Sequence, residues 1–401
     1  MTPTRTIKFR EPSLLADNGV EFTCWIDDPS GNSRTESVRF LGDAELAQDE
    51  ETLALAMAAL SGASFNRVVL PLAISPHIRK RMEAYCGAII DAPIAKSPRS
   101  DYQYGDRTVL SFSGGLDSLS VRALMADRNI DLVSIDFGGR FRRERKFFQQ
   151  FETTIVETDI VSSNLRAHGH DFMLVPALLR ARAIGASGIA TGQILESSAH
   201  SLLDFLGVAE ESSNDAGFDL LTDLAAVRPV GGMTEVGTAL TSLRLCRDHI
   251  SDSLVSLAGP REEKLHRKHV LLELSAKMLG IDIKLPEIER PPRPHFVFGE
   301  TFAVDFLVLW VAKRAGRSWA ESMVRDLPDD LEDFLKNLRL DFYERVAAVS
   351  SGIEAPQAHD ALCARIRATG MIPWTDDDQR EARAVVEYLT CARRRRELPV
   401  T

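Results

Sequence analysis

The spacing of hydrophobic and polar positions changes along the chain. Its first hundred residues or so combine strand-like and helical patterns. Residues 20–26, 37–41 and 67–72 have the pattern of strands, whereas residues 43–60 and 76–85 have helical spacing. A polar stretch with two prolines, 93–106, indicates a linker. We therefore expect residues 1–104 to form an N-terminal α/β unit, which carries no catalytic motif and serves packing or substrate gating.

From Arg107 onward, short apolar stretches alternate with helical ones. Strands are predicted at 108–112, 132–136, 154–157, 186–191 and 224–227, and helices at 116–127, 142–151, 172–184 and 234–246. This alternation is typical of a parallel sheet covered by helices on both faces. Residues 105–285 are therefore expected to form an α/β domain whose ligand crevice lies beyond the carboxyl ends of the strands.

The last part of the chain has mostly helical spacing. A connection stiffened by prolines covers residues 284–294, and residues 302–315, 319–327, 331–338 and 378–396 are predicted helices. Residues 286–401 should therefore form a mainly helical region. The expected fold class is α/β, with a parallel sheet between the N-terminal unit and this helical region.

Composition agrees with an ordinary globular protein of two or three domains. No apolar run reaches the roughly 18–20 residues that a membrane span needs, and the N-terminus lacks an apolar signal core. The five cysteines are dispersed and form no CxxC pair, which indicates reduced thiols. We expect a cytoplasmic protein without a membrane partner, and a homo-oligomer stays open.

The net charge of −10 argues against nucleic-acid binding over the whole surface. Two basic runs, 140–146 and 393–396, leave a local contact with nucleic acid open. The alternative for the first run is a solvated helix face. For the second run it is a set of cations at a helix C-terminus, where they suit the helix dipole.

The most informative chemistry lies in Ser113-Gly-Gly-Leu-Asp-Ser118, between a predicted strand and a predicted helix. The backbone N–H groups of a helix N-terminus converge on an anion there, and glycines let phosphate oxygens approach closely. The hydroxyl groups of Ser111, Ser113 and Ser118 offer further donors. The loop is not a Walker A motif, because no Gly-x4-Gly-Lys-Ser/Thr string occurs in the chain.

This loop resembles the pyrophosphate loop of the N-type ATP pyrophosphatases, the PP-loop superfamily, which includes 7-cyano-7-deazaguanine synthase and 4-thiouridine synthetase. The resemblance implies an adenine nucleotide alpha hydrolase-like domain that binds ATP and Mg²⁺ and splits ATP between its α and β phosphates. An acceptor oxygen is adenylated, and a nitrogen or sulfur nucleophile then displaces AMP. The acceptor, a small molecule or a tRNA, is not named by the sequence.

The resemblance also implies roles for single residues of the loop and of the second strand end. Gly114, Gly115 and Leu116 would hold the phosphates through their backbone, and Asp117 would orient Mg²⁺. The alternative for Asp117 is a helix cap or dipole partner. Asp136 and Phe137 would frame the adenosine, and the alternative for Asp136 is an Asx turn before two glycines.

Two more segments match the superfamily at the ends of later strands. Gly192 and Gln193 stand where relatives have Thr-Gly-Glu or Thr-Gly-His, flanking the nucleotide and the acceptor. Gln193 offers hydrogen bonds but no base. Glu196 is a candidate substitute, or else a solvent-facing residue of a first helical turn.

The segment beginning at Arg228 resembles one in 4-thiouridine synthetase, with Arg228 and Glu235 in line. The lysine expected beside the phosphates is replaced by Thr234 in this chain. Three cations are candidates for its role: Arg244, Arg142 and Lys146.

The sequence favours nitrogen over sulfur as the second nucleophile. Cys246 is the cysteine available after the loop in this half, and a buried free thiol is its alternative role. The zinc cysteines of the deazaguanine synthases are missing, and His266 and His269 cannot complete a tetrahedral site, so no zinc is expected. We expect an adenylate-forming ligase with Asp117, Gln193 and Arg228 in its active site. A sulfurtransferase using Cys246 and a non-catalytic ATP sensor are the alternatives.

Overall fold

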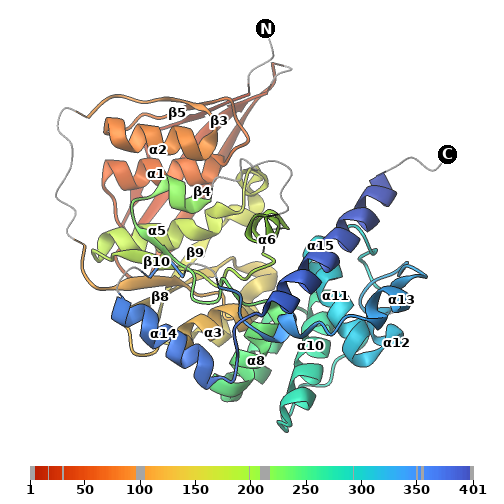
Figure 1. The fold of residues 1–401 in the computed structure, drawn as a ribbon. Helices are drawn as coiled ribbons and strands as arrows, with labels where there is room; N and C mark the ends of the chain where they lie inside the picture. The colour runs from red at the N-terminus through yellow and green to blue at the C-terminus, as the bar shows by residue number, and fades with distance from the viewer. Residues whose placement is uncertain are drawn as a thin grey trace. The chain divides into compact units, whose positions relative to one another are not determined.

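The computed structural model describes residues 5–16, 18–28, 31–95, 104–197, 199–207, 217–291, 293–348, 351–353 and 356–397 (Figure 1). Much of the expected linker, residues 96–103, lies outside them. Contacts divide the chain into two compact units. The first contains Met1–Ser113, Ala126–Thr191 and Ser213–Val227, and the second contains Gly114–Met125, Gly192–Ser212 and Arg228–Thr401.

The first unit is built on one mixed sheet, which has eleven strands in the described ranges. Their bounds are β1 Thr6–Phe9, β2 Ser13–Leu15, β3 Gly19–Asp27, β4 Ser33–Gly42, β5 Arg67–Val69, β6 Ile89–Asp91, β7 Thr108–Ser111, β8 Ile130–Asp136, β9 Thr153–Thr158, β10 Gly188–Ala190 and β11 Ala225–Val227. The order is β11-β10-β7-β8-β9-β4-β3-β1-β5-β6, with β2 beside β3.

The strands from β7 to β11 form the parallel part of the sheet. Each pairs in parallel with its neighbour in the order β9-β8-β7-β10-β11, which confirms the parallel sheet predicted from the alternating pattern. β7 is the first of them in the chain and lies in the middle, because β8 and β9 extend to one side and β10 and β11 to the other. The carboxyl ends of β7 and β10 therefore flank the switch point, where ligands bind in such sheets.

The N-terminal strands continue the same sheet. β4 pairs antiparallel with β9, with Phe40 opposite Thr158 and Gly42 opposite Val156. The sequence pattern predicted β3, β4 and β5 but missed β1, β2 and β6, which have three or four residues each. The division into three consecutive domains stays a prediction, because a shared sheet does not test whether each part folds alone.

Five α-helices accompany the sheet within the described parts of the first unit. They are α1 Glu50–Ser61, α2 Pro76–Cys86, α4 Arg142–Phe148, α5 Val175–Ala183 and α7 Phe218–Leu221. α1 starts later than the predicted residue 43, because the Asp49 side chain caps it by accepting the Thr52 N–H. α5 packs on β7, β8 and β10, and α1 packs on α5 and on the neighbouring α2 (Figure 1).

The second unit is helical. Its α-helices are α3 Leu116–Leu124, α6 Ala199–Leu206, α8 Glu235–Leu245, α9 Ile250–Leu257, α10 Glu263–Leu279, α11 Phe302–Ala315, α12 Arg317–Ala320, α13 Leu331–Lys336, α14 Pro356–Ala368 and α15 Asp376–Glu397. α8 packs against both α3 and α10, and α11 contributes Phe306 and Trp310 to the core. Helices follow residue 286 as expected, although the predicted helix 319–327 is present only as the short α12 and α14 was not foreseen.

The chain as a whole has an α/β fold with a largely parallel mixed sheet, as expected. Among the described helices, none combines the length and the apolar character that crossing a membrane requires.

Candidate functional site

The glycine loop leads directly into α3, as the sequence predicts. Gly114 has a φ of +72°, which favours glycine, and Gly115 is the N-cap residue of α3 without a side-chain cap. Ser253 Oγ, from α9, donates to the Gly114 carbonyl oxygen at 2.6 Å and fixes the loop. Leu116 is fully buried in the helical core, so its contribution to a ligand is limited to its backbone.

The loop hydroxyl groups differ in their surroundings. Ser118 is buried, and its Oγ donates to the Gly115 carbonyl oxygen at 3.1 Å, so this hydroxyl secures the start of the helix. Ser111 ends β7 half-buried, and Ser113 is exposed. The donor roles of Ser111 and Ser113 toward phosphate stay predictions.

Asp117 is held by two other helices of the second unit. Its Oδ1 accepts a short hydrogen bond from Thr238 Oγ1 on α8. Its Oδ2 lies 3.9 Å from Lys268 Nζ on α10. Asp117 is therefore not the N-cap of α3, a position that Gly115 occupies, but a half-buried carboxylate in the first turn with a cation beside it.

Lys268 is a cation beside Asp117 that the sequence analysis did not predict. Its Nζ lies 2.7 Å from Glu235 Oε1, and both side chains are about nine-tenths buried, with exposed fractions of 9% and 10%. Burial alone lowers the pKa of Lys268, but the charges of Asp117 and Glu235 outweigh it and raise that pKa. Burial likewise works against the Glu235 carboxylate, whose pKa Lys268 and Arg267 nevertheless lower, so the pair is ionised.

Of the three cations expected in place of a lysine at position 234, one lies at the other end of α8 and two lie in the first unit, and the role of those two stays a prediction. Arg244 is exposed in the last turn of α8, roughly 13 Å along the helix axis from Glu235. Arg142 and Lys146 are exposed on α4 of the first unit. Thr234 itself is buried and caps α8, because its Oγ1 accepts the Gly237 N–H at 3.2 Å and donates to the Tyr343 carbonyl oxygen at 2.6 Å.

Glu196 is a buried carboxyl group rather than a solvent-facing one. Its Oε1 accepts the Glu235 backbone N–H at 2.7 Å, while its Oε2 has no hydrogen-bond partner in the described part of the chain. Burial, reinforced by the nearby Glu235 and Asp117 charges, raises its pKa to about 8. Glu196 is therefore protonated at neutral pH and leaves the Lys268–Glu235 pair undisturbed.

The structure brings Gln193 and Arg228 together. Arg228 Nε donates to Gln193 Oε1 at 2.8 Å, and the Arg228 backbone N–H donates to the Ser351 carbonyl oxygen at 2.7 Å. Gly192 passes so close to α3 that an added Cβ would lie 3.0 Å from the Ser118 nitrogen and 3.1 Å from the Asp117 Cβ. Asp117, Gly192, Gln193 and Arg228 thus form one continuous group in the second unit.

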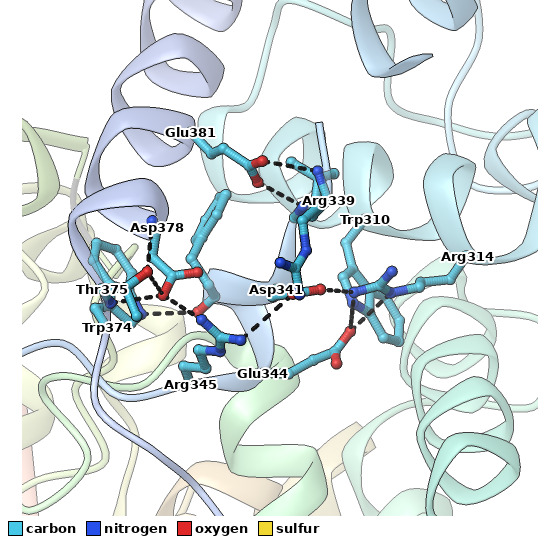
Figure 2. A network of polar contacts seen from close by, with 12 residues as sticks. Trp310, Arg314, Arg339, Asp341, Glu344, Arg345, Trp374, Thr375, Asp378 and Glu381 are labelled. Atoms are coloured by element: carbon cyan, nitrogen blue, oxygen red, sulfur yellow. Dashed lines mark hydrogen bonds and ion pairs between the residues drawn. The ribbon is translucent and has the colours of Figure 1, made fainter. Parts of the chain in front are cut away.

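Figure 2 shows a polar network formed by arginine and carboxylate side chains of the second unit. Arg314 Nη2 lies 3.2 Å from Asp341 and 2.6 Å from Glu344, and Arg345 Nη1 lies 2.6 Å from Asp378 Oδ2. These contacts hold the 3₁₀ helix η6, Asp341–Glu344, which contains Tyr343. The bond from Thr234 to the Tyr343 carbonyl oxygen then fixes the start of α8, where Glu235 lies.

The residues expected around the adenosine lie in the first unit. Asp136 Oδ1 accepts the Gly138 N–H at 2.8 Å, which shows the Asx-type turn, and its Oδ2 lies 2.7 Å from Arg145 Nη1. Arg145 also pairs with Glu157, so one cation of the basic run has a structural role. Phe137 is half-buried against Phe141, with ring centroids 5.5 Å apart. Contact with a nucleotide stays a prediction for Asp136 and Phe137.

Cys246, the candidate for sulfur chemistry, is buried on the far end of α8. Its Sγ donates to the Leu119 carbonyl oxygen at 3.5 Å, and burial raises its pKa to about 11. A thiol in this state is a poor nucleophile, so the structure does not favour sulfur transfer through Cys246.

The two histidines considered for zinc lie on α10 with other partners. His266 Nε2 is 2.9 Å from Ser322 Oγ, and His269 Nδ1 is 3.8 Å from Glu273. Across the described ranges, no group of three or more His, Cys, Asp and Glu side chains has the geometry of a metal site. Mg²⁺ does not need such a group, because it usually binds one or two carboxylates together with substrate phosphates.

Comparison with known proteins gives no family: no family model matches the chain, and no curated protein or solved structure is significantly similar to it.

Proposed function

We propose that this protein is an Mg·ATP-dependent enzyme of the PP-loop type. It would adenylate a carbonyl or carboxyl oxygen, release pyrophosphate, and let a nitrogen nucleophile displace AMP. The observation that carries the proposal is Lys268, a buried and ionised lysine beside Asp117 at the glycine loop. It supplies the cation that a triphosphate site needs and that the sequence lacks at Thr234.

The position of the loop in the sheet supports this assignment. The loop follows β7, the first strand of the parallel series, and leads into the N-terminus of α3. Phosphate groups bind at such helix starts because of the converging N–H groups and the helix dipole. A helix start alone would be weak support, but here it coincides with a fixed cation and a carboxylate.

Mg²⁺ fits the donor set. Asp117 offers a half-buried carboxylate at the loop, and a single carboxylate with phosphate oxygens is a usual environment for Mg²⁺. Asp117 would hold the ion, with Thr238 fixing the orientation of its carboxylate. When bound, Mg²⁺ neutralises charge on the phosphates.

The remaining residues would position and stabilise rather than transfer protons. The loop backbone would bind phosphate oxygens, and Lys268 would stabilise the negative charge of the departing pyrophosphate. Arg228, oriented by Gln193, adds a guanidinium for an anionic group of ATP or of the acceptor. A neutral Glu196 keeps a further negative charge away from these anions. A free amine as nucleophile needs no general base.

The test of the reaction is direct. The full chain is incubated with Mg·ATP, ammonium ions and a panel of carboxylic acids and nucleobases, and AMP and pyrophosphate are measured. AMP formed only when an acceptor is present supports the ligase. ATP binding without AMP for any acceptor would identify a sensor instead, and no ATP binding would refute both. A parallel incubation with tRNA tests the other acceptor class, and AMP formed there would identify tRNA as the acceptor.

Lys268 has its own test, Lys268→Met. Loss of a charge-assisted contact should weaken Mg·ATP binding about ten- to a hundredfold, measured by calorimetry. In this variant Glu235 stays buried without its cation, so the free energy of unfolding should fall by about 3–5 kcal/mol. The double variant Lys268→Met with Glu235→Gln removes this effect. Arg244→Met is the matched control and should leave ATP binding unchanged. Equal affinities of the double variant and the wild type would refute the role of Lys268.

A further inference from the structure

A second reactive group lies on α14, where a thiol and an imidazole face each other. Cys363 Sγ is 3.5 Å from His359 Nε2, one helical turn earlier on the same face. The other ring nitrogen, Nδ1, is 3.3 Å from the hydroxyl of Ser351. Cys363 and His359 are both half-buried, so solvent and small molecules reach them.

The other cysteines have different surroundings. Cys24, Cys86 and Cys246 are buried, and burial raises their pKa values to about 12, 12 and 11. Cys391 is exposed on α15, and no histidine hydrogen-bonds to it in the described part of the chain. Cys363 is thus the accessible thiol that has an imidazole within hydrogen-bond distance, and a thiolate next to an imidazolium is the reactive form of cysteine.

This thiol is connected to the candidate functional site by a short series of contacts. The Ser351 hydroxyl meets His359, and the Ser351 carbonyl oxygen accepts the Arg228 N–H at 2.7 Å. Arg228 in turn donates to Gln193 at 2.8 Å. α14 also packs on α3, with Arg365 Nη1 donating to the Ala123 carbonyl oxygen at 3.2 Å. The segment that orients His359 is therefore the same one that holds Arg228.

We propose that Cys363, with His359, is a nucleophilic modification site that takes a low-molecular-weight disulfide. The Cys363 thiol gives its proton to His359 Nε2, and the thiolate attacks one sulfur of the disulfide. A new S–S bond forms to Cys363, the original S–S bond breaks, and the departing thiolate takes the proton from His359. Cys363 is oxidised and one half of the disulfide is reduced, so electrons and atoms balance.

The modification would have a consequence at Arg228. A bound glutathione carries carboxylates, which would lie next to the segment that fixes Arg228 and compete for its guanidinium. This part of the inference rests on the proposed function, whereas the reactivity of Cys363 does not.

Reactivity is tested by limited alkylation of the full chain with iodoacetamide at pH 7, followed by peptide mass spectrometry. Cys391 is the internal reference. Cys363 should react about fivefold faster than Cys391, because His359 lies within hydrogen-bond distance of its thiol and accepts the proton as the sulfur attacks. His359→Gln should bring the two rates together, and His359→Asn serves if His359→Gln unfolds the chain. A Cys363 rate no higher than that of Cys391, or one unaffected by the loss of His359, would overturn the proposal.

The ligand is tested with oxidised glutathione as the probe. One adduct on Cys363 and none on Cys363→Ser supports the site, and absence of an adduct on Cys363 refutes it. Mg·ATP binding is then measured before and after the reaction. The adduct should weaken the affinity for Mg·ATP at least about fivefold, which is the lower end of ordinary coupling between two sites. Reduction of the adduct with dithiothreitol should restore the affinity. Unchanged affinity would refute the coupling, whereas failure to bind ATP at all would refute the proposed function and leave the adduct standing.

Discussion

Glu196 is a carboxyl group that the fold keeps uncharged. Its raised pKa follows from burial, because desolvation penalises the charged form and the described part of the chain offers Oε2 no hydrogen bond. The Lys268–Glu235 pair beside it is just as buried but ionised, since each member has an opposite charge at 2.7 Å. Partner geometry, not burial alone, therefore decides the charge of each group in this cluster.

Replacing Glu196 by Gln should remove one part of the pH dependence of stability. The folded state keeps the Glu196 proton from the ordinary pKa of 4.5 up to about 8, whereas the unfolded chain loses it near 4.5. The wild type should therefore lose about 3 kcal/mol of unfolding free energy between pH 5 and pH 8 that Glu196→Gln does not lose. Urea denaturation of both proteins at several pH values measures this, and parallel curves would contradict it.

At the scale of single residues, the sequence predicted the grouping of some site residues but not the position of Lys268. The pairing of Arg228 with Gln193 near Asp117 follows the motif positions, because those motifs stand at the ends of neighbouring strands. Lys268 was not expected at the loop, because many residues separate the two in the sequence. One signal was present: Leu265, Lys268 and Leu272 occupy one apolar stripe of α10, where a charge is unusual.

The elements that form the site are held by close backbone approaches and by caps. Gly192 lies so close to α3 that an added Cβ would be tightly packed, and Thr234 joins the start of α8 to η6. The alternating pattern predicted β7, β8, β9 and β10 because each carries a run of buried apolar residues. The pattern did not predict the start of α1, which depends on a single capping residue. It also missed β1, which has only four residues.

Gly192→Ala should disturb the loop against α3. The added methyl group meets the Ser118 nitrogen at 3.0 Å and Asp117 at 3.1 Å, and relief of this overpacking should cost about 1–3 kcal/mol of unfolding free energy. Gly217→Ala is the matched control, because among the described residues its Cβ would meet nothing closer than 3.7 Å. Urea denaturation and Mg·ATP binding are measured for both variants. Equal stability of the two would show that the loop yields easily.

Thr234→Ala should destabilise the start of α8. It removes the side-chain cap and the hydrogen bond to the Tyr343 carbonyl oxygen, which together are worth about 1–2 kcal/mol. Thr234→Ser keeps the hydroxyl and should recover most of this loss. Thermal or urea denaturation measures both, and a Ser variant as unstable as the Ala variant would indicate that the methyl group matters more.

At the scale of the whole molecule, the continuity of the sheet is the main departure from the expected organisation. The sequence predicts β4 and β9 but not the antiparallel ladder between them, because pairing between residues more than a hundred positions apart leaves no local pattern. Phe22 and Phe40 of the N-terminal strands lie in the same core as Val109 and Val133 of the parallel strands. The first hundred residues are thus part of the sheet that positions the loop.

Removal of the N-terminal segment should therefore be costly. A chain of residues 105–401 loses the strand beside β9 and exposes that edge together with part of the core. We expect aggregation, or unfolding without a cooperative transition, when the fragment is expressed alone and examined by circular dichroism. A fragment that unfolds cooperatively would instead support an independent domain at residues 105–285.

The interleaving of the two units also sets an order for their completion during synthesis. The first unit has all its strands once Val227 has been made, whereas α3, made much earlier, packs against α8 and α14. Leu116, Leu119 and Leu124 of α3 must therefore remain without their final partners while more than a hundred further residues emerge from the ribosome. Ribosome-bound chains arrested after residue 230 should then be cut by protease within α3, whereas chains arrested beyond α14 should be protected there.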